Sequence, residues 1–414
     1  MKRLGFENKI VDYLLSHYRI LFFVVVTVIS ILARYYGYYF ISDDMKIFLF
    51  PWFEEIGSNG GFTGLNVQVG DYNILYQTII AIGTHVTDNP LLYYKGISIA
   101  GDYFLAITCA YTLTKVCNKS FVNDNTFYIT YGCVIMLPIV VFNSSFWGQC
   151  DGIYTAFLIW TLYFLYSEKY RRAFIMYGVA FAFKLQSVFL LPLIIILYFS
   201  ERKFSVLNFL FTIGTFWLTG LAGFLNGRNL TAPFEIYLFQ SVEYKRLFIN
   251  FESFWRIMAT ENQYSELVEL AVLLTVVLMG FMLFVFISHK IVLSTYEEYL
   301  AGACMTVWTV LMFLPAMHER YSYLLDILLV MLVVLNIRYC AFAFFEIIVS
   351  MYTYGVYFFR IDGNQIFFSI LEIVLWFAFV CVFFYKIVYA KKDNIKKENE
   401  IGNGKDNLPG NTML

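Results

Sequence analysis

Charged residues are scarce in this chain. Asp, Glu, Lys and Arg make up 14% of its 414 residues, whereas hydrophobic residues make up 60%. A soluble domain typically has about 25% charged and about 45–50% apolar residues. The composition therefore excludes an ordinary soluble domain and indicates a polytopic membrane protein. The net charge is −1 and the basic residues are dispersed, so we predict no nucleic-acid partner.

Short motifs that bind metals or phosphates are also missing. The seven cysteines show no CxxC or other metal-ligand spacing, and most lie in apolar runs, where they serve as small hydrophobic residues. No Gly-rich phosphate loop is present, and no polar stretch is long enough for a separate soluble domain that would bind a nucleotide. We also find no clear internal repeat.

Long apolar runs account for most of the chain, and a membrane-spanning helix needs about 20 apolar residues. We expect an all-α, polytopic helical bundle over residues 1–390, followed by a charged, disordered cytoplasmic tail at 391–414. Two of the predicted spans, 173–185 and 187–200, are short and could instead form one long helix. Charged segments that look cytoplasmic flank the pair, so we expect the chain to cross the membrane and return. The twelve predicted spans are 20–40, 92–113, 125–145, 152–167, 173–185, 187–200, 205–225, 267–288, 298–316, 322–337, 341–359 and 366–388.

The positive-inside rule sets the orientation of these spans. With both termini in the cytoplasm, most Lys and Arg residues lie on the cytoplasmic side, and large outer loops run from about 41 to 91 and from about 226 to 266. The segment 71–86 could be a further span. Because that choice would invert the charge bias of everything after it, we interpret the segment as a helix on the outer surface.

With this topology, polar side chains from distant parts of the chain collect near the outer face. Each charge would cost roughly 2.5–3.5 kcal/mol at mid-membrane, so charges that meet and pair in one aqueous cavity indicate a functional site. Asp102 lies inside the second span instead, and we expect it to bond another helix. The residues near the outer face are Asp43, Asp44, Asp71, Gln149, Asp151, Lys184, Gln186, His318, Glu319 and Arg320.

Each of these features also has a purely structural interpretation. Asp43 and Asp44 could cap the amphipathic helix that follows them. The segment 318–320 could be an ordinary loop with a local ion pair. Lys184 could extend to the surface, and Trp147 could anchor the chain at the membrane interface.

Five segments, in this order, resemble the integral-membrane glycosyltransferases of the GT-C superfamily. They are SDDMKIFLFPWFEEI, GDYNILYQ, FNSSFWGQCDGIYT, AFAFKLQSVFLLPL and AMHERYSYLL, and they extend from Ser42 to Leu325. The chain is most similar to the bacterial branch related to the second mannosyltransferase of GPI-anchor synthesis. It departs from that pattern where Asn73 and Ile74 follow Asp71-Tyr72, since the family often has prolines there.

The resemblance implies an inverting transferase in the cell membrane that moves a hexose from a polyprenyl-phosphate carrier to a glycan or glycolipid acceptor outside the cytoplasm. An acidic residue early in the first outer loop would be the catalytic base. By its spacing to Pro51-Trp52, Asp44 matches that residue best, and Asp43 is the next choice. The segment 318–320 would bind the phosphate of the donor.

The residue types suit this chemistry. A sugar hydroxyl is a weak nucleophile and needs a carboxylate within about 2.6–3.2 Å as its base. The departing lipid phosphate needs positive charge, which Arg320, His318 and Lys184 could supply. Sugar or acceptor hydroxyls would contact Gln149, Asp151, Asp71 and Glu319, and Trp147 would stack on a sugar ring.

A metal ion is a weaker possibility. Asp43 and Asp44, with Asp71 or Asp151, could bind Mg²⁺ or Mn²⁺, but the third partner that such a site needs cannot be located from sequence. We therefore predict no metal.

Two other membrane functions stay open. A transporter or flippase would favour internal symmetry and polar groups at the membrane midplane. A polysaccharide polymerase or ligase would also have many spans and large outer loops, but it would use a lipid-linked oligosaccharide as donor.

Overall fold

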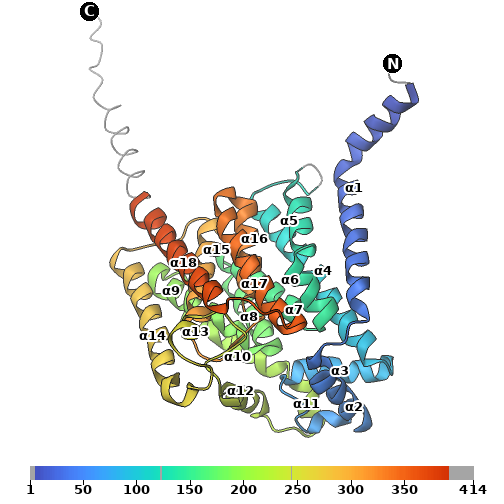
Figure 1. Cartoon of the computed structure of the whole chain (residues 1–414), viewed down its shortest axis with the longest axis vertical. Coiled ribbons are helices and arrows are strands. Elements are labelled where there is room, and N and C mark those ends of the chain that lie inside the picture. Colours follow the sequence, from blue (N-terminus) through green and yellow to red (C-terminus); the bar gives the residue numbers. More distant parts are fainter. Residues whose placement is uncertain (1–4, 122–123, 244, 391–414) are drawn as a thin grey trace, which may run out of the picture.

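The computed structural model describes residues 5–121, 124–243 and 245–390, which form an almost entirely helical membrane protein (Figure 1). The predicted tail at 391–414 lies outside the described residues. The first half of the chain forms α1 (Gly5–Tyr38), η1 (Met45–Leu49), α2 (Phe50–Ser58), η2 (Thr63–Asn66), α3 (Ile74–Val86), α4 (Pro90–Val116), α5 (Thr126–Ile135), α6 (Pro138–Val141), η3 (Phe142–Trp147), α7 (Asp151–Tyr166), α8 (Tyr170–Phe183), η4 (Leu185–Leu190) and α9 (Leu191–Glu201). The second half forms η5 (Val206–Asn208), α10 (Phe209–Leu218), α11 (Leu221–Leu225), α12 (Ala232–Glu243), β1 (Phe248–Ile249), α13 (Phe254–Met258), α14 (Tyr264–Ser288), α15 (Tyr296–Phe313), β2 (Met317–His318), α16 (Tyr323–Leu335), η6 (Ile337–Tyr339), α17 (Cys340–Phe359), α18 (Gln365–Phe384) and η7 (Tyr385–Ala390).

Five helices are long and apolar enough to cross a membrane: Gly5–Tyr38, Pro90–Val116, Tyr264–Ser288, Ile337–Phe359 and Gln365–Val388. A sixth span would consist of Thr126–Ile135 and Pro138–Trp147, which meet at an angle of 55°. The bend coincides with Pro138, which cannot continue the hydrogen bonding of the preceding helix. The remaining predicted spans fall on shorter helices, so the all-α membrane fold is established, whereas the count of twelve spans stays a prediction.

The two described ends of the chain lie at the same end of the bundle. In Figure 1 the beginning of α1 and the end of α18 point upward, whereas α2, α3, α11 and α12 gather at the bottom. We call this second end the loop end, because it contains the helices of the two predicted outer loops.

Segment 71–86 forms a short helix at the loop end. Its helix, α3, has 13 residues and therefore a length of about 20 Å, too short for a hydrocarbon core of about 30 Å. Asn73 caps α3 by accepting a hydrogen bond from the N–H of Ile74 (2.8 Å), and its side-chain amide donates to the carbonyl of Pro233 (2.9 Å). Asn73 therefore starts α3 and ties it to α12.

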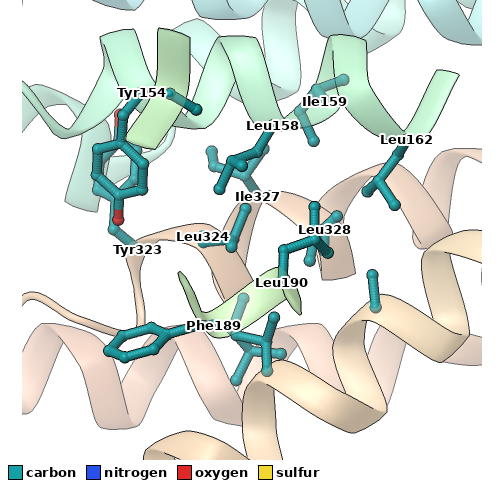
Figure 2. Packing of buried hydrophobic residues seen from close by; sticks show 14 of the residues in the cluster. Tyr154, Leu158, Ile159, Leu162, Phe189, Leu190, Tyr323, Leu324, Ile327 and Leu328 are labelled. Atoms are coloured by element: carbon teal, nitrogen blue, oxygen red, sulfur yellow. The ribbon is translucent and has the colours of Figure 1, made fainter. Parts of the chain in front are cut away.

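The core lies between helices that are distant in the sequence. Figure 2 shows leucine and isoleucine side chains of α7 facing those of α16, with η4 beside them. All of these side chains are buried, so they fix how α7, η4 and α16 lie against one another. The labelled residues are Tyr154, Leu158, Ile159, Leu162, Phe189, Leu190, Tyr323, Leu324, Ile327 and Leu328.

Two buried polar contacts attach α1 to α4 just before the first predicted outer loop. Asp102 accepts hydrogen bonds from Nε (3.0 Å) and Nη2 (2.7 Å) of Arg34, which confirms that it bonds another helix. Lys95 donates to the carbonyls of Gly37 (2.7 Å) and Tyr38 (2.8 Å), and so caps the C-terminal end of α1. The exit of the chain toward residues 43 and 44 is thereby fixed.

Candidate active site

A polar cavity of about 190 Å³ lies at the loop end of the bundle. Side chains from both predicted outer loops and from the turns between helices converge on it. Eight residues predicted from the sequence to lie near the outer face line it, namely Asp44, Asp71, Gln149, Lys184, Gln186, His318, Glu319 and Arg320. The other lining residues are Phe48, Leu49, Trp52, Tyr72, Gln240, Ile249, Asn250, Tyr321 and Tyr357.

Asp44 presents its carboxylate to this cavity. Oδ2 accepts hydrogen bonds from Nε1 of Trp147 (2.8 Å) and Nε2 of Gln149 (3.3 Å), and Nη1 of Arg320 lies 3.5 Å away. Oδ1 accepts from the hydroxyl of Tyr357 (2.8 Å) and, among the described residues, from no other donor. A carboxylate oxygen can accept about two hydrogen bonds, so Oδ1 retains room for one proton donor.

The helix-capping interpretation of Asp44 is wrong. Its side chain makes no capping hydrogen bond to η1. Ser42 performs that function, because its hydroxyl oxygen accepts a hydrogen bond from the N–H of Met45 (3.3 Å). The hydroxyl of Ser42 also donates to the carbonyl of Trp147 (3.3 Å), which ties the two segments around Asp44 together.

Asp43 takes a different direction from its neighbour. Its side chain is 56% exposed and forms an ion pair with Arg360 (3.2 Å), whereas that of Asp44 is 20% exposed. Asp43 does not line the cavity. Of the two adjacent acids, only Asp44 is placed to act there.

The segment 318–320 reaches the cavity because a short strand pair holds it. β1 pairs in parallel with β2, with Phe248 opposite Met317 and Ile249 opposite His318. The N–H of Ala316 adds a hydrogen bond to the carbonyl of Leu247 (2.9 Å). This contact joins the second predicted outer loop to the turn between α15 and α16.

Arg320 spans two carboxylates. Its Nη1 lies 3.5 Å from Asp44 and 3.8 Å from Oε1 of Glu319, and its guanidinium carbon lies 5.2 Å from the centre of a ring of Trp147. Among the described residues, Nε of Arg320 has no hydrogen-bond partner although it is buried. The guanidinium therefore keeps donor capacity for an oxyanion in the cavity.

Burial shifts the pKa values of the two residues that precede Arg320. It lowers the pKa of His318 well below its ordinary value, and the charges of Arg320 and Lys184 lower it further. A neutral imidazole is therefore expected at neutral pH. Burial raises the pKa of Glu319 to about 7, in spite of the opposing effect of Arg320.

Lys184 is buried and forms a close ion pair with Asp151, so the alternative interpretation, in which it extends to the surface, is wrong. Asn143 holds the other oxygen of Asp151 by donating a hydrogen bond to it (2.7 Å). Lys184 lines the cavity, whereas Asp151 lies behind it. The structure thus gives Asp151 a contact with the cation rather than with the cavity.

Trp147 is fully buried, so its interpretation as an interface anchor is wrong. Its ring stacks on Tyr357 with centroids 4.2 Å apart, and its N–H holds Asp44. Stacking on a sugar would require the ring to become exposed. Gly148 follows with φ of +74°, a left-handed turn that lets Trp147 and Gln149 both contact Asp44.

Sequence reasoning missed several lining residues. Tyr357 lies in the last turn of α17, and nothing distinguishes it in a chain that has 33 tyrosines. Tyr72 donates a hydrogen bond to Oε1 of Gln149 (2.8 Å). Trp52 lines the cavity as well. Its place directly after Pro51 in the segment SDDMKIFLFPWFEEI was the available signal.

Within the described ranges, no three His, Cys, Asp or Glu side chains converge in a way that could hold a metal ion. Asp43 and Asp44 also point to different surroundings, one toward Arg360 and the other into the cavity. The possible Mg²⁺ or Mn²⁺ site therefore gains no support from the geometry.

No model of a known protein family matches the chain, and no curated protein matches it.

Proposed function

We propose that this protein is an integral-membrane glycosyltransferase of the GT-C type. It would transfer a hexose from a polyprenyl-phosphate carrier to a glycan or glycolipid acceptor. The observation that carries the proposal is the meeting of Asp44 and Arg320 (3.5 Å) in one polar cavity at the end of an apolar bundle. A carboxylate and a guanidinium that line the same cavity suit a base and a phosphate ligand.

In this mechanism Oδ1 of Asp44 is the general base. The acceptor hydroxyl oxygen bonds to the anomeric carbon of the donor, and its proton passes to Asp44. The bond from the anomeric carbon to the phosphate oxygen breaks at the same time, and its electron pair leaves with the lipid phosphate. Attack opposite the leaving group inverts the configuration. Tyr357 and Trp147 orient the base by their hydrogen bonds to it.

Arg320 and Lys184 would balance the charge that grows on the departing phosphate. Arg320 has a buried Nε–H without a partner among the described residues, and its planar fork suits two phosphate oxygens. Lys184, whose ammonium group is held by the ion pair with Asp151, adds a second cation to the cavity wall. Burial and nearby cations lower the pKa of His318, so its imidazole is neutral. It would therefore stabilise the phosphate by donating a hydrogen bond and not by a positive charge.

A lipid carrier is favoured by an adjoining cavity of about 330 Å³. It shares Gln186, Gln240 and Tyr321 with the polar cavity, and most of its other lining side chains are apolar. Val268 and Val272 of the apolar helix α14 form part of its wall. An isoprenoid chain could therefore lie beside α14 while its phosphate reaches Arg320.

We also propose that the chain crosses the membrane twelve times. Both termini would then lie in the cytoplasm, and the loop end would lie outside the cell membrane. That orientation gives the cavity access to acceptors at the cell surface, such as a capsular or cell-wall glycan or a glycolipid.

The direct test is donor consumption by the full-length protein in lipid nanodiscs. Labelled polyprenyl-phosphate glucose, mannose and galactose are each offered with a mixed glycan acceptor, and released polyprenyl phosphate is measured. We expect one monosaccharide lipid to be consumed, and consumption to stop in Asp44→Asn. Consumption of only a nucleotide sugar, or of only a lipid-linked oligosaccharide, would contradict the proposal.

A further inference from the structure

A third cavity, of about 380 Å³, opens between residues 66–71 and α12 (Ala232–Glu243) at the loop end. We call it the outer groove. Its size is within the range of about 300–1,000 Å³ that small-molecule sites occupy. Asp71 and Gln240 line both the outer groove and the polar cavity, so the two spaces adjoin. A molecule lying in the groove could extend one end toward Asp44.

Gln240 stands where three cavities meet. It lines the polar cavity, the apolar cavity beside α14 and the outer groove. Its Oε1 is buried and has no hydrogen-bond partner among the described residues. An unsatisfied buried amide oxygen costs free energy, about 1–3 kcal/mol, unless a ligand or water donates to it. Gln240 therefore points to a ligand with hydroxyl or amine donors.

The charges of the groove are strongly unbalanced. Asp71, Glu235 and Glu243 are acidic, and Arg228 is the basic residue in the wall. Arg228 directs its guanidinium inward. There it donates hydrogen bonds to the carbonyl of Leu65 (3.4 Å) and to the side-chain oxygens of Gln77 (3.1 Å) and Gln68. It is consequently not available to an anionic ligand.

Two of the carboxylates influence each other. Burial raises the pKa of Asp71. Burial also raises the pKa of Glu243, and the negative charge of Asp71 raises it further. Both carboxylates line the same groove, so a negative charge placed in it would be repelled by their ionised forms. Hydroxyl or amine groups would instead find acceptors on both.

An aromatic side chain completes the groove. Phe239 of α12 lines it and is 67% exposed. An apolar ring beside carboxylate and amide oxygens suits a sugar, which has one face of C–H groups and a rim of hydroxyls.

We propose that the outer groove binds the acceptor glycan and selects chains without anionic groups, so that phosphate- or carboxylate-bearing glycans are rejected. This inference depends on the proposed function for its meaning. It can nevertheless be tested by binding alone, without any donor.

The test measures binding of soluble hexasaccharides to the full-length protein in nanodiscs at low salt. The probes are neutral mannohexaose, amine-bearing chitosan hexamer and anionic hexagalacturonate. We expect the first two to bind at least about tenfold more tightly than the third, a difference of about 1.4 kcal/mol. Equal binding of the three, or binding of none, would overturn the inference.

Matched charge-reversal variants test whether the selectivity arises in the groove. Glu243→Lys should bring hexagalacturonate to within about threefold of mannohexaose, because like-charge repulsion is replaced by attraction. Glu54→Lys makes the same charge change on an exposed residue of α2 outside the groove and should leave the ratio unchanged. Equal effects of both variants would overturn the assignment of the selectivity to the groove.

Phe239→Ala should weaken mannohexaose binding about tenfold through loss of ring contact. Unchanged binding in this variant would overturn the assignment of the glycan to this groove. The donor assay separates the two proposals. Donor consumption without hexasaccharide binding overturns only the groove assignment, whereas selective binding without consumption of any polyprenyl-phosphate sugar overturns only the transferase.

Discussion

The carboxylate of Asp44 and the guanidinium of Arg320 lie 3.5 Å apart, although their positions in the chain differ by 276. One residue follows α1 and the other lies between α15 and α16. Two distant loops therefore supply the two charges of one cavity. The proposed chemistry depends on this contact.

Asp44→Asn should reduce transfer by about 10²–10⁴-fold, the usual contribution of a general base, because the amide cannot take the acceptor proton. Donor affinity, measured separately, should change little. Asp43→Asn is the matched control, since its side chain is exposed and pairs with Arg360. Loss of transfer in Asp43→Asn but not in Asp44→Asn would reverse the assignment.

Tyr357→Phe should lower the turnover number about tenfold or more. The hydroxyl donates to Oδ1 of Asp44 (2.8 Å), and hydrogen bonds to charged groups contribute about 1.5–3 kcal/mol. Tyr352→Phe removes a hydroxyl from the same helix that has no partner among the described residues, and it should be silent. Steady-state kinetics of both variants decide the point, and equal turnover numbers would contradict a positioning role for Tyr357.

Arg320→Lys should raise the KM for the polyprenyl-phosphate donor about tenfold or more, because a point charge replaces a planar fork of donors. Inhibition by free polyprenyl phosphate should weaken in parallel. Arg360→Lys changes an exposed arginine that pairs with Asp43 and should leave both values unaltered. An unchanged inhibition constant in Arg320→Lys would contradict the assignment of Arg320 as a ligand of the donor phosphate.

The stability of the protein should depend on pH through Glu319. Burial raises its pKa from about 4.5 to about 7, so the folded state keeps a proton that the unfolded state releases. Stability therefore falls as pH rises from about 4.5 to about 7 and levels off above that range. In Glu319→Gln, the decrease in Tm between pH 5 and pH 7 should be smaller than in the parent protein. Glu54→Gln, an exposed control, should not alter it.

Asp102→Ala should destabilise the bundle by about 3–5 kcal/mol, because Arg34 would be left buried without its carboxylate. A lower Tm in detergent is the expected measurement. The double variant Arg34→Met with Asp102→Leu should recover most of the loss, since neither side chain then carries a charge. A double variant as unstable as Asp102→Ala would argue against the ion pair as the cause.

Much of the helical architecture could be predicted from local composition. Apolar runs bounded by charged turns predict where helices lie, and each predicted span contains a helix in the structure. Segment 71–86 forms the predicted short helix. The polar turns at 149, 184 and 318–320 also contribute side chains to one cavity. These inferences succeed because a membrane confines polar side chains to few places.

The sequence by itself determined that the chain is a helical membrane protein and which turns carry unusual polar groups, because hydropathy and charge act locally along the chain. Only the tertiary structure decided that Asp44 rather than Asp43 faces the cavity, since adjacent residues in a helical turn point in different directions. It also decided that Tyr357 holds the carboxylate, that Asp151 supports Lys184, and that Gln240 joins three cavities. These relations depend on how distant helices pack, and the pattern of any single segment does not contain that information.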